Sequence, residues 1–391
     1  MKQSDVTLII PGYNNLRHLK NCYASIKKHA KDTKLVLLDD GSTDGTIDWI
    51  NALEDSNITS VYRSKDRIGH TILYDKGIDL AETKLVGILH CDMIIGPNYI
   101  ENMVKHLKPN TVVAGTRIEP PLHPPGNEKI IQNFGLDFDD LDITGFEEFC
   151  LKQQEINKDE ISKGMFAPWI IYKEDFLAMG GHDHVFAPFP YEDSDIFERW
   201  ILSGYKLIQS RDAFVYHLTC RGHRFTEQIG KDDEYFKKAS QRAAREYLRK
   251  WGSWIQNDEF QHPIIKPKYN MGFSVKNCSL QAMAFLEPMC SNIYVEDQSV
   301  ISDYFKYEQP NTHFDLKQRV ALITADKDND IVIEFDFKEL KQEDMMIVQQ
   351  LPSIIKESGR IGDMELGAFK LRIFSMKSQE KDMISPIKKY N

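Results

Sequence analysis

The chain has 391 residues, of which 41% are hydrophobic and 28% are charged, and its formal net charge is -10. A chain of this length and composition can bury a sizeable core and has room for two domains. The acidic balance argues against indiscriminate binding to nucleic acid, because phosphate contacts need a surplus of Lys and Arg along one surface.

The six cysteines are scattered without a C-x-x-C pair, which is typical of reduced thiols in a cytosol rather than of a disulfide framework. No secretory signal opens the chain, and no stretch approaches the roughly 20 apolar residues that a transmembrane helix needs. We therefore expect a soluble, cytoplasmic protein without a transmembrane segment.

Short apolar runs alternate with helical patterns over the first third of the chain. The run VTLII at 6–10 ends at Pro11 and Gly12, and the apolar positions that follow predict a helix capped by Asn14. This alternation is typical of a parallel sheet with crossover helices. The further strands that we expect are 34–38, 58–62 and 84–89, with helices at about 47–53 and 69–81.

Polar residues gather directly after each expected strand, at 11–15, 39–46, 63–70 and 90–92. In an open parallel sheet, ligands bind beyond the carboxyl ends of the strands, so these clusters predict a binding site. The stretch LLDDGSTDGT places Asp39 and Asp40 at the end of a buried strand, where adjacent like charges are costly unless the protein uses them. Helix capping is the alternative explanation, and it suits Asp44 better than Asp39.

Six segments of the chain contain these polar clusters and further polar residues beyond residue 92. They are VTLIIPGYNN (6–15), LLDDGSTDGT (37–46), LHCDMIIGP (89–97), GGHDHVF (180–186), PYEDSDIFERWILSGYKL (190–207) and VYHLTCRGHRF (215–225) with YLRKWG (247–252). Together they resemble the motifs of the family 2 glycosyltransferases. The resemblance implies an α/β fold of the GT-A type, Rossmann-like with a mostly parallel sheet flanked by helices, over residues 1–255.

For the nucleotide, the resemblance implies that Asp39 reads the base, because a carboxylate in the plane of a uracil accepts its N3 hydrogen. A UDP-sugar is therefore the favoured donor. Tyr13 would stack on the nucleoside, or it packs on the edge of the sheet. The other expected nucleotide contacts are Pro11, Gly12, Asp40, Arg67 and Cys91. For Arg67, a position in a solvated turn is the alternative.

A departing diphosphate gathers negative charge, and Mg²⁺ or Mn²⁺ is the usual Lewis acid that stabilises it. The resemblance implies Asp92 and His217 as metal ligands, with a half-buried strand-end histidine as the alternative for His217. His90 stands where the family usually has the first acid of D-x-D. It could contact the ribose or the sugar, bind the metal, or simply pack.

A basic loop follows His217. We expect Arg221, His223 and Arg224 to fold over the diphosphate, with solvated surface charge as the alternative. The spacing of His217, Cys220 and His223 invites a zinc interpretation, which we reject because a fourth ligand is missing.

The acceptor hydroxyl needs a general base within hydrogen-bond reach. The resemblance implies the pair Glu192 and Asp193, with Asp193 as the base; stabilisation at a helix N-terminus is the structural alternative. No nucleophile for a covalent intermediate is apparent, so we expect a single inverting displacement. Trp169 would stack on a sugar face or lie in the core, and the insertion 120–163 would help to select the acceptor.

Beyond residue 255 the pattern changes. Residues 256–391 predict a smaller α+β domain with strands at 331–337 and 368–375 and a helix at 343–357. The acidic run at 326–330 resembles an EF-hand loop, but Ile331 replaces the required Gly and Phe337 the bidentate Glu, so we interpret it as an acidic hairpin turn. Acceptor binding, self-association into a homo-oligomer and partner docking all stay open for this domain.

We therefore predict an inverting, metal-dependent glycosyltransferase that moves a sugar from a nucleotide sugar to a glycan, a lipid or another hydroxyl acceptor. Two alternatives stay open. One is a catalytically weak sugar-nucleotide binding or scaffolding protein, with His90 as a sign of decay. The other is a glycosyltransferase for modified nucleic-acid bases, for which the basic stretch 237–250 would contact phosphate.

Overall fold

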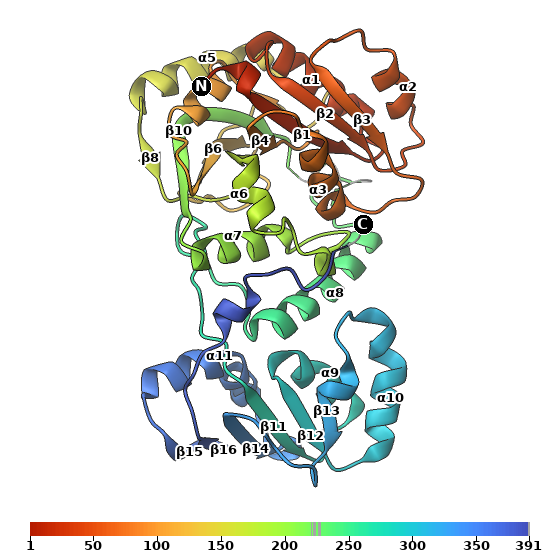
Figure 1. Cartoon of the computed structure of the whole chain (residues 1–391), viewed down its shortest axis with the longest axis vertical. Helices are drawn as coiled ribbons and strands as arrows, with labels where there is room; N and C mark the ends of the chain where they lie inside the picture. Colours follow the sequence, from red (N-terminus) through yellow and green to blue (C-terminus); the bar gives the residue numbers. More distant parts are fainter. Residues whose placement is uncertain (220, 222–223, 226–227, 390–391) are drawn as a thin grey trace. The chain divides into compact units, whose positions relative to one another are not determined.

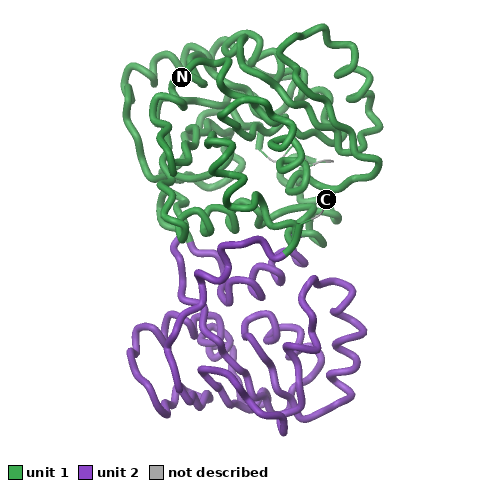
Figure 2. Tube along the Cα trace, viewed as in Figure 1, with its two compact units in different colours: residues 1–239, 257–263, 388–391 green, residues 240–256, 264–387 purple. Residues whose placement is uncertain are grey.

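The computed structural model describes residues 1–219, 221, 224–225 and 228–389. The chain forms two compact units, which Figure 2 shows in different colours. The first comprises residues 1–239, 257–263 and 388–391, and the second comprises 240–256 and 264–387. The predicted boundary at 255 therefore differs from the division in the structure, which falls inside a long helix.

A ten-stranded sheet forms the centre of the first unit (Figure 1). Its main path runs β3-β2-β1-β4-β9-β6-β10-β5, with β7 beside β6 and β8 beside β10. Strands β1 to β4 are parallel, as the sequence predicted, whereas β9 and β5 run antiparallel to their neighbours. The strands are β1 Val6–Gly12, β2 Lys34–Asp39, β3 Ile58–Arg63, β4 Leu85–Ile88, β5 Met93–Ile95, β6 Thr111–Glu119, β7 Lys129–Ile131, β8 Ile161–Ser162, β9 Trp169–Tyr172 and β10 Lys206–His217.

Helices cover both faces of this sheet because its strands are apolar on both sides. Buried side chains of α1 and α4 share one hydrophobic cluster with β1 and β2, whereas α3 packs on the opposite face. Gly77 allows that close approach, since a Cβ there would lie 2.3 Å from Cγ2 of Ile9. The helices are α1 Leu16–His29, α2 Thr46–Asn51, α3 His70–Leu80, α4 Tyr99–Val104, α5 Ile143–Ile156, α6 Lys173–Ala178, α7 Glu192–Leu202 and α8 Glu234–Trp251.

The register of the parallel strands brings the predicted polar clusters to one edge. Gly12 at the end of β1 pairs with Asp39 at the end of β2, and Ile9 pairs with Ile88 at the end of β4. The loops after these strands therefore begin side by side. This edge of the sheet is where the candidate site lies.

The second unit has a six-stranded sheet in the order β13-β12-β11-β14-β16-β15. Apolar side chains of α9, α10 and α11 form one cluster with the strands. The strands are β11 Met271–Lys276, β12 Asn292–Val295, β13 Val320–Leu322, β14 Ile331–Asp336, β15 Gly362–Leu366 and β16 Phe369–Ile373. The helices are α9 Leu280–Leu286, α10 Gln298–Glu308 and α11 Gln342–Ser358.

Two expectations for this unit differ from the structure. Strands β13, β12, β11 and β14 are mutually parallel, so the unit is more α/β than the predicted α+β arrangement. The acidic run 326–330 connects β13 to β14, which are not neighbours in the sheet, so it is not a hairpin turn. Both differences depend on which strands are neighbours in the sheet, and neighbouring strands such as β11 and β14 lie far apart in the sequence.

Buried ion pairs explain why the second half of α8 belongs to the second unit. The guanidinium of Arg249 lies 2.7 Å from Glu246, 2.7 Å from Glu287 and 2.5 Å from Glu308. All four side chains are almost completely buried, so each charge depends on its partners.

Among the described residues, none of the helices combines the length and apolar character of a membrane span.

Candidate active site

A pocket opens at the carboxyl edge of the parallel strands. It gathers most of the residues that the sequence predicted for the nucleotide and the metal, although they come from five separate stretches of the chain. Its lining consists of Pro11, Gly12, Tyr13, Asp40, Arg67, Gly69, His70, Leu73, Tyr74, His90, Cys91, Asp92 and Phe189.

The adjacent carboxylates of Asp39 and Asp40 have different surroundings. Oδ1 of Asp39 accepts the backbone N–H of Ser42 at 3.0 Å, while its buried Oδ2 has no hydrogen-bond partner among the described residues. Arg63 Nε lies 3.3 Å from this oxygen as an ion pair. Asp40 instead accepts two backbone N–H groups, at Ile68 and Gly69, and burial raises its pKa. Asp40 thus shapes the loop that carries Arg67.

Arg67 lies among aromatic rings at the pocket. Its guanidinium carbon is 4.1 Å from the ring centre of Tyr13, 4.5 Å from that of Tyr235 and 5.2 Å from that of Phe189. Such cation–π contacts hold a guanidinium without neutralising its charge. Arg67 therefore remains available to an anionic ligand.

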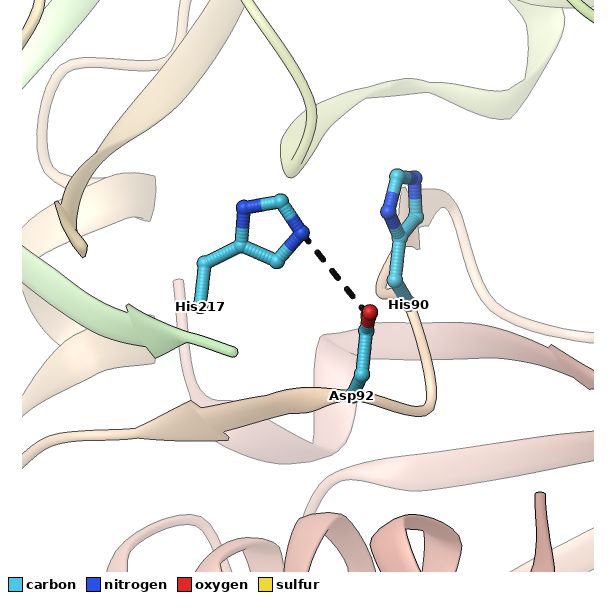
Figure 3. A group of neighbouring side chains, drawn as sticks. All are labelled: His90, Asp92 and His217. Carbon is cyan, nitrogen blue, oxygen red and sulfur yellow. Dashed lines mark ion pairs between the residues drawn. The ribbon is translucent and has the colours of Figure 1, made fainter. Parts of the chain in front are cut away.

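Three side chains converge into a candidate metal site. The ligand atoms of His90, Asp92 and His217 all lie within 4.8 Å of one another, and Nε2 of His217 is 3.8 Å from Oδ1 of Asp92. Figure 3 shows the two imidazole rings flanking the carboxylate. One carboxylate and two imidazoles suit a divalent first-row ion such as Mn²⁺. The structure thus places His90 with the two predicted ligands.

A buried carboxylate that the sequence did not single out orients His217. Oε1 of Glu119 accepts the Nδ1 hydrogen of His217 at 2.9 Å and also binds Arg117, while Oε2 binds Lys129. Burial alone would raise the pKa of Glu119, but Arg117, His217 and Lys129 hold it well below its usual range. Because the ionised carboxylate only accepts, Nδ1 carries the hydrogen and Nε2 keeps its lone pair for a metal.

The predicted catalytic pair begins helix α7, and the structure adds a partner to it. Nε2 of His70 lies 2.6 Å from Oε1 of Glu192. Glu192 raises the pKa of His70 above its usual value despite burial, and His70 in turn lowers that of Glu192. His70 also stacks at 6.5 Å from His90, which connects the carboxylate pair to the metal site.

Asp193 differs from its neighbour in the direction of its pKa shift. Its Oδ1, like Oε2 of Glu192, is buried without a hydrogen-bond partner among the described residues. Burial, followed by the negative charge of Glu192, raises the pKa of Asp193 to about 7. A carboxyl group with this pKa can take up a proton near neutral pH, as a general base must.

Residues 7–167 match the family described as Glycosyl transferase family 2. The matched segment covers β1 to β8 and the metal candidates His90 and Asp92, whereas Asp193 and His217 lie beyond it.

Two curated relatives are glycosyltransferases by name. The chain is 24% identical over 238 residues to Validoxylamine A glucosyltransferase of Streptomyces hygroscopicus subsp. jinggangensis, covering 54% of each chain. It is 26% identical over 105 residues to Glycosyltransferase GlyG of Streptococcus pneumoniae serotype 4, covering 26% of this chain and 35% of the relative. The chain thus spans about half the length of the first of these relatives, and less of the second.

Two solved structures show a distant likeness. One is GalNAc-T7 with UDP, GalNAc and Mn²⁺, with 17% identity, a TM-score of 0.44, and coverage of 65% of this chain and 48% of that chain. The other is the mannosyltransferase PcManGT from Pyrobaculum calidifontis with GDP-Man and Mn²⁺, with 17% identity, a TM-score of 0.41, and coverage of 62% and 61%.

The basic loop behaves differently from the prediction at its described positions. The backbone N–H of Arg221 binds Oδ2 of Asp92 at 2.9 Å, but its side chain pairs with Asp137 in the insertion. Arg224 pairs with Asp232. Both guanidinium groups therefore already have carboxylate partners, and His223 lies outside the described residues.

Trp169 and Cys91 are both buried. Trp169 on β9 has no exposed surface and packs edge-on against Trp200 at 5.1 Å, so the sugar-stacking alternative is excluded in favour of a core tryptophan. Cys91 lines the pocket, where its sulfur accepts a hydrogen bond from Asn15, and burial raises the pKa of its thiol to about 12. This thiol stays neutral and unreactive.

Replacing Gly69 with Ala is expected to destabilise the protein by about 1–3 kcal/mol through overpacking, beyond the cost of the backbone conformation. Gly69 has a φ of +88°, and a Cβ there would lie 2.3 Å from Cα of Pro188. Gly204 provides the matched control, because its φ is +85° but nothing lies within 4 Å of its Cβ position. Urea unfolding of both variants measures the difference; equal losses would mean that the contact with Pro188 is unimportant.

Proposed function

We propose that the chain is an inverting, metal-dependent glycosyltransferase that transfers a sugar from a nucleotide sugar to a hydroxyl acceptor. The convergence of His90, Asp92 and His217 beside the His70–Glu192 pair carries this proposal. Asp193 follows Glu192 directly in the chain, and its pKa, raised to about 7, supports its role as the base. These are the groups that the departure of a diphosphate and the activation of a hydroxyl require.

In the proposed reaction, Asp193 accepts the proton of the acceptor hydroxyl as the hydroxyl oxygen bonds to the anomeric carbon. The bond from that carbon to the phosphate oxygen breaks, and its electron pair leaves with the nucleoside diphosphate. A divalent cation bound at His90, Asp92 and His217 would supply Lewis acidity toward the leaving phosphates. Glu192 stays ionised against His70, and its charge keeps Asp193 basic.

The favoured donor is a UDP-sugar. The buried Oδ2 of Asp39 is ion-paired with Arg63 but accepts no hydrogen bond among the described residues, which supports a role as acceptor for the N3 hydrogen of uracil. Thermal unfolding with UDP-, GDP- and dTDP-sugars and Mn²⁺ tests this choice, because a ligand of the native state raises the melting temperature. We expect the largest rise with a UDP-sugar; a larger rise with a GDP-sugar would overturn the assignment.

Glu119→Gln is expected to weaken Mn²⁺ binding about 10- to 100-fold, because loss of a carboxylate that orients a histidine ligand has that effect. Calorimetric titration of Mn²⁺ measures the affinity without any assay of activity. Glu128→Gln is the matched control, since Glu128 also pairs with Arg117 but not with His217. Equal affinities in the wild type and Glu119→Gln would exclude the proposed orientation of His217.

No observation favours the two alternatives. The ligand atoms of His90, Asp92 and His217 lie within 4.8 Å of one another, which supports a role for His90 in binding a cation rather than decay of the site. Within the basic stretch 237–250, Arg245 and Arg249 are paired with Glu308 and Arg249 is also buried against Glu287, so these guanidinium groups are not available to nucleic-acid phosphates.

A further inference from the structure

Helix α3 is joined to the segment that leads into the catalytic carboxylates, residues 181–193, which we call the catalytic segment. The contacts occur at three positions along the helix. They are His70 with Glu192, Thr71 Oγ1 with the carbonyl of Pro188 at 3.0 Å, and Asp75 with both His182 and His184. These contacts hold the segment that ends at Asp193 against α3.

Asp75 is the buried centre of the contact farthest from the pocket. Its Oδ1 accepts the backbone N–H of His182 at 3.1 Å and Nδ1 of the same residue at 2.8 Å. Its Oδ2 accepts Nε2 of His184 at 2.9 Å and the ammonium group of Lys389. Burial would raise the pKa of Asp75, but the two histidines and Lys389 hold it well below its usual range.

Lys389 reaches this site from a position 314 residues farther along the chain. Residues 388–391 belong to the first unit, although the stretch 264–387 before them forms most of the second. The backbone of Lys388 donates to Oδ1 of Asp183 at 3.0 Å and accepts the N–H of His184 at 2.9 Å. The ammonium group of Lys389 also donates to the carbonyl of His182 at 2.9 Å.

We infer that Lys389 is a positioning residue for catalysis, which fastens the catalytic segment to α3 through Asp75. This inference rests on the proposed function. A buried carboxylate needs a compensating charge, and among the described residues that donate to Asp75 only Lys389 carries a permanent one. Without it, residues 182–184 lose both the ammonium contact at the His182 carbonyl and the charge that stabilises Asp75, so the segment that carries Asp193 becomes less well placed.

Lys389→Met in the full chain tests the role of this charge. We expect kcat to fall about 10- to 100-fold, the effect of a misplacement near 1 Å, with the donor dissociation constant unchanged. Lys389→Arg keeps the positive charge and is expected to restore most of kcat. Lys377→Met is the matched control, because Lys377 is an exposed lysine near the same end of the chain, and we expect it to leave kcat unchanged.

Hydrogen–deuterium exchange provides a readout that does not depend on activity. Peptides that cover the catalytic segment should exchange faster in Lys389→Met than in the wild type, and Lys389→Arg should reverse this. Asp75→Asn should weaken the same contact, so the effects of Asp75→Asn and Lys389→Met on kcat should be clearly less than additive.

Unchanged exchange in residues 181–193 of Lys389→Met would overturn the inference, whatever the activity. Faster exchange with unchanged kcat would also overturn it, because the contact would then be structural only. If the wild type transfers no sugar from any nucleotide sugar, the proposed function fails, and the exchange experiment still decides whether Lys389 fastens the segment.

Discussion

Asp193→Asn is expected to lower kcat for sugar transfer by about 10²- to 10⁴-fold, the usual contribution of a general base. The amide keeps nearly the size of the carboxyl group but cannot accept the proton of the acceptor hydroxyl. The dissociation constant of the donor should stay within about twofold, because Asp193 is not part of the lining of the pocket at the carboxyl edge of the strands. Steady-state kinetics and calorimetric titration of the donor measure the two quantities separately. A variant with unchanged kcat would remove Asp193 from the mechanism.

The pH dependence provides a second test of the same residue. Asp193 must be deprotonated to act as a base, and its pKa is raised to about 7, so kcat should rise as the pH rises through about 7 and level off above it. Glu192→Gln removes the neighbouring charge that helps to raise this pKa, and it should move the midpoint to lower pH. A midpoint that stays in place, or moves upward, would contradict the coupling between the two carboxylates.

Loss of a metal ligand is the second change with a large expected effect. His217→Ala should lower kcat/KM about a thousandfold, corresponding to roughly 4 kcal/mol of lost transition-state stabilisation by the cation. EDTA should abolish the activity of the wild type, and added Mn²⁺ should restore it.

His106→Ala is the matched control for this experiment, because His106 also lies in the first unit but outside the pocket. We expect it to retain the activity of the wild type. Full activity of His217→Ala, or of the wild type in EDTA, would contradict the proposed metal site.

Sequence reasoning predicted the parallel strands and the pocket for a physical reason. Buried parallel strands appear as continuous apolar runs, and the polar residues that directly follow them must lie at one edge of the sheet. The local pattern alone therefore predicted that Asp92 lies near Tyr13 and Asp40, and all three line the same pocket. His217 required the resemblance to a family, because its strand lies far along the chain.

The side chains that contact Glu192 and His217 were not predictable from local pattern. His70 contacts Glu192, which lies 122 residues away in the sequence, and Glu119 contacts His217, which lies 98 residues away. Only the folded sheet brings these pairs together. Trp169 occupies a strand that is buried on both sides, which its own sequence neighbours do not reveal. The parallel order of the second sheet likewise depends on contacts between distant strands.

The release of UDP from a panel of UDP-sugars, with and without Mn²⁺, by the wild type and by Asp193→Asn tests the central claim most directly. The claim is that a cation site and a catalytic carboxylate act together on the same nucleotide sugar. The account predicts release that requires both Mn²⁺ and Asp193. Release at the same rate by Asp193→Asn, or without any divalent ion, would contradict it.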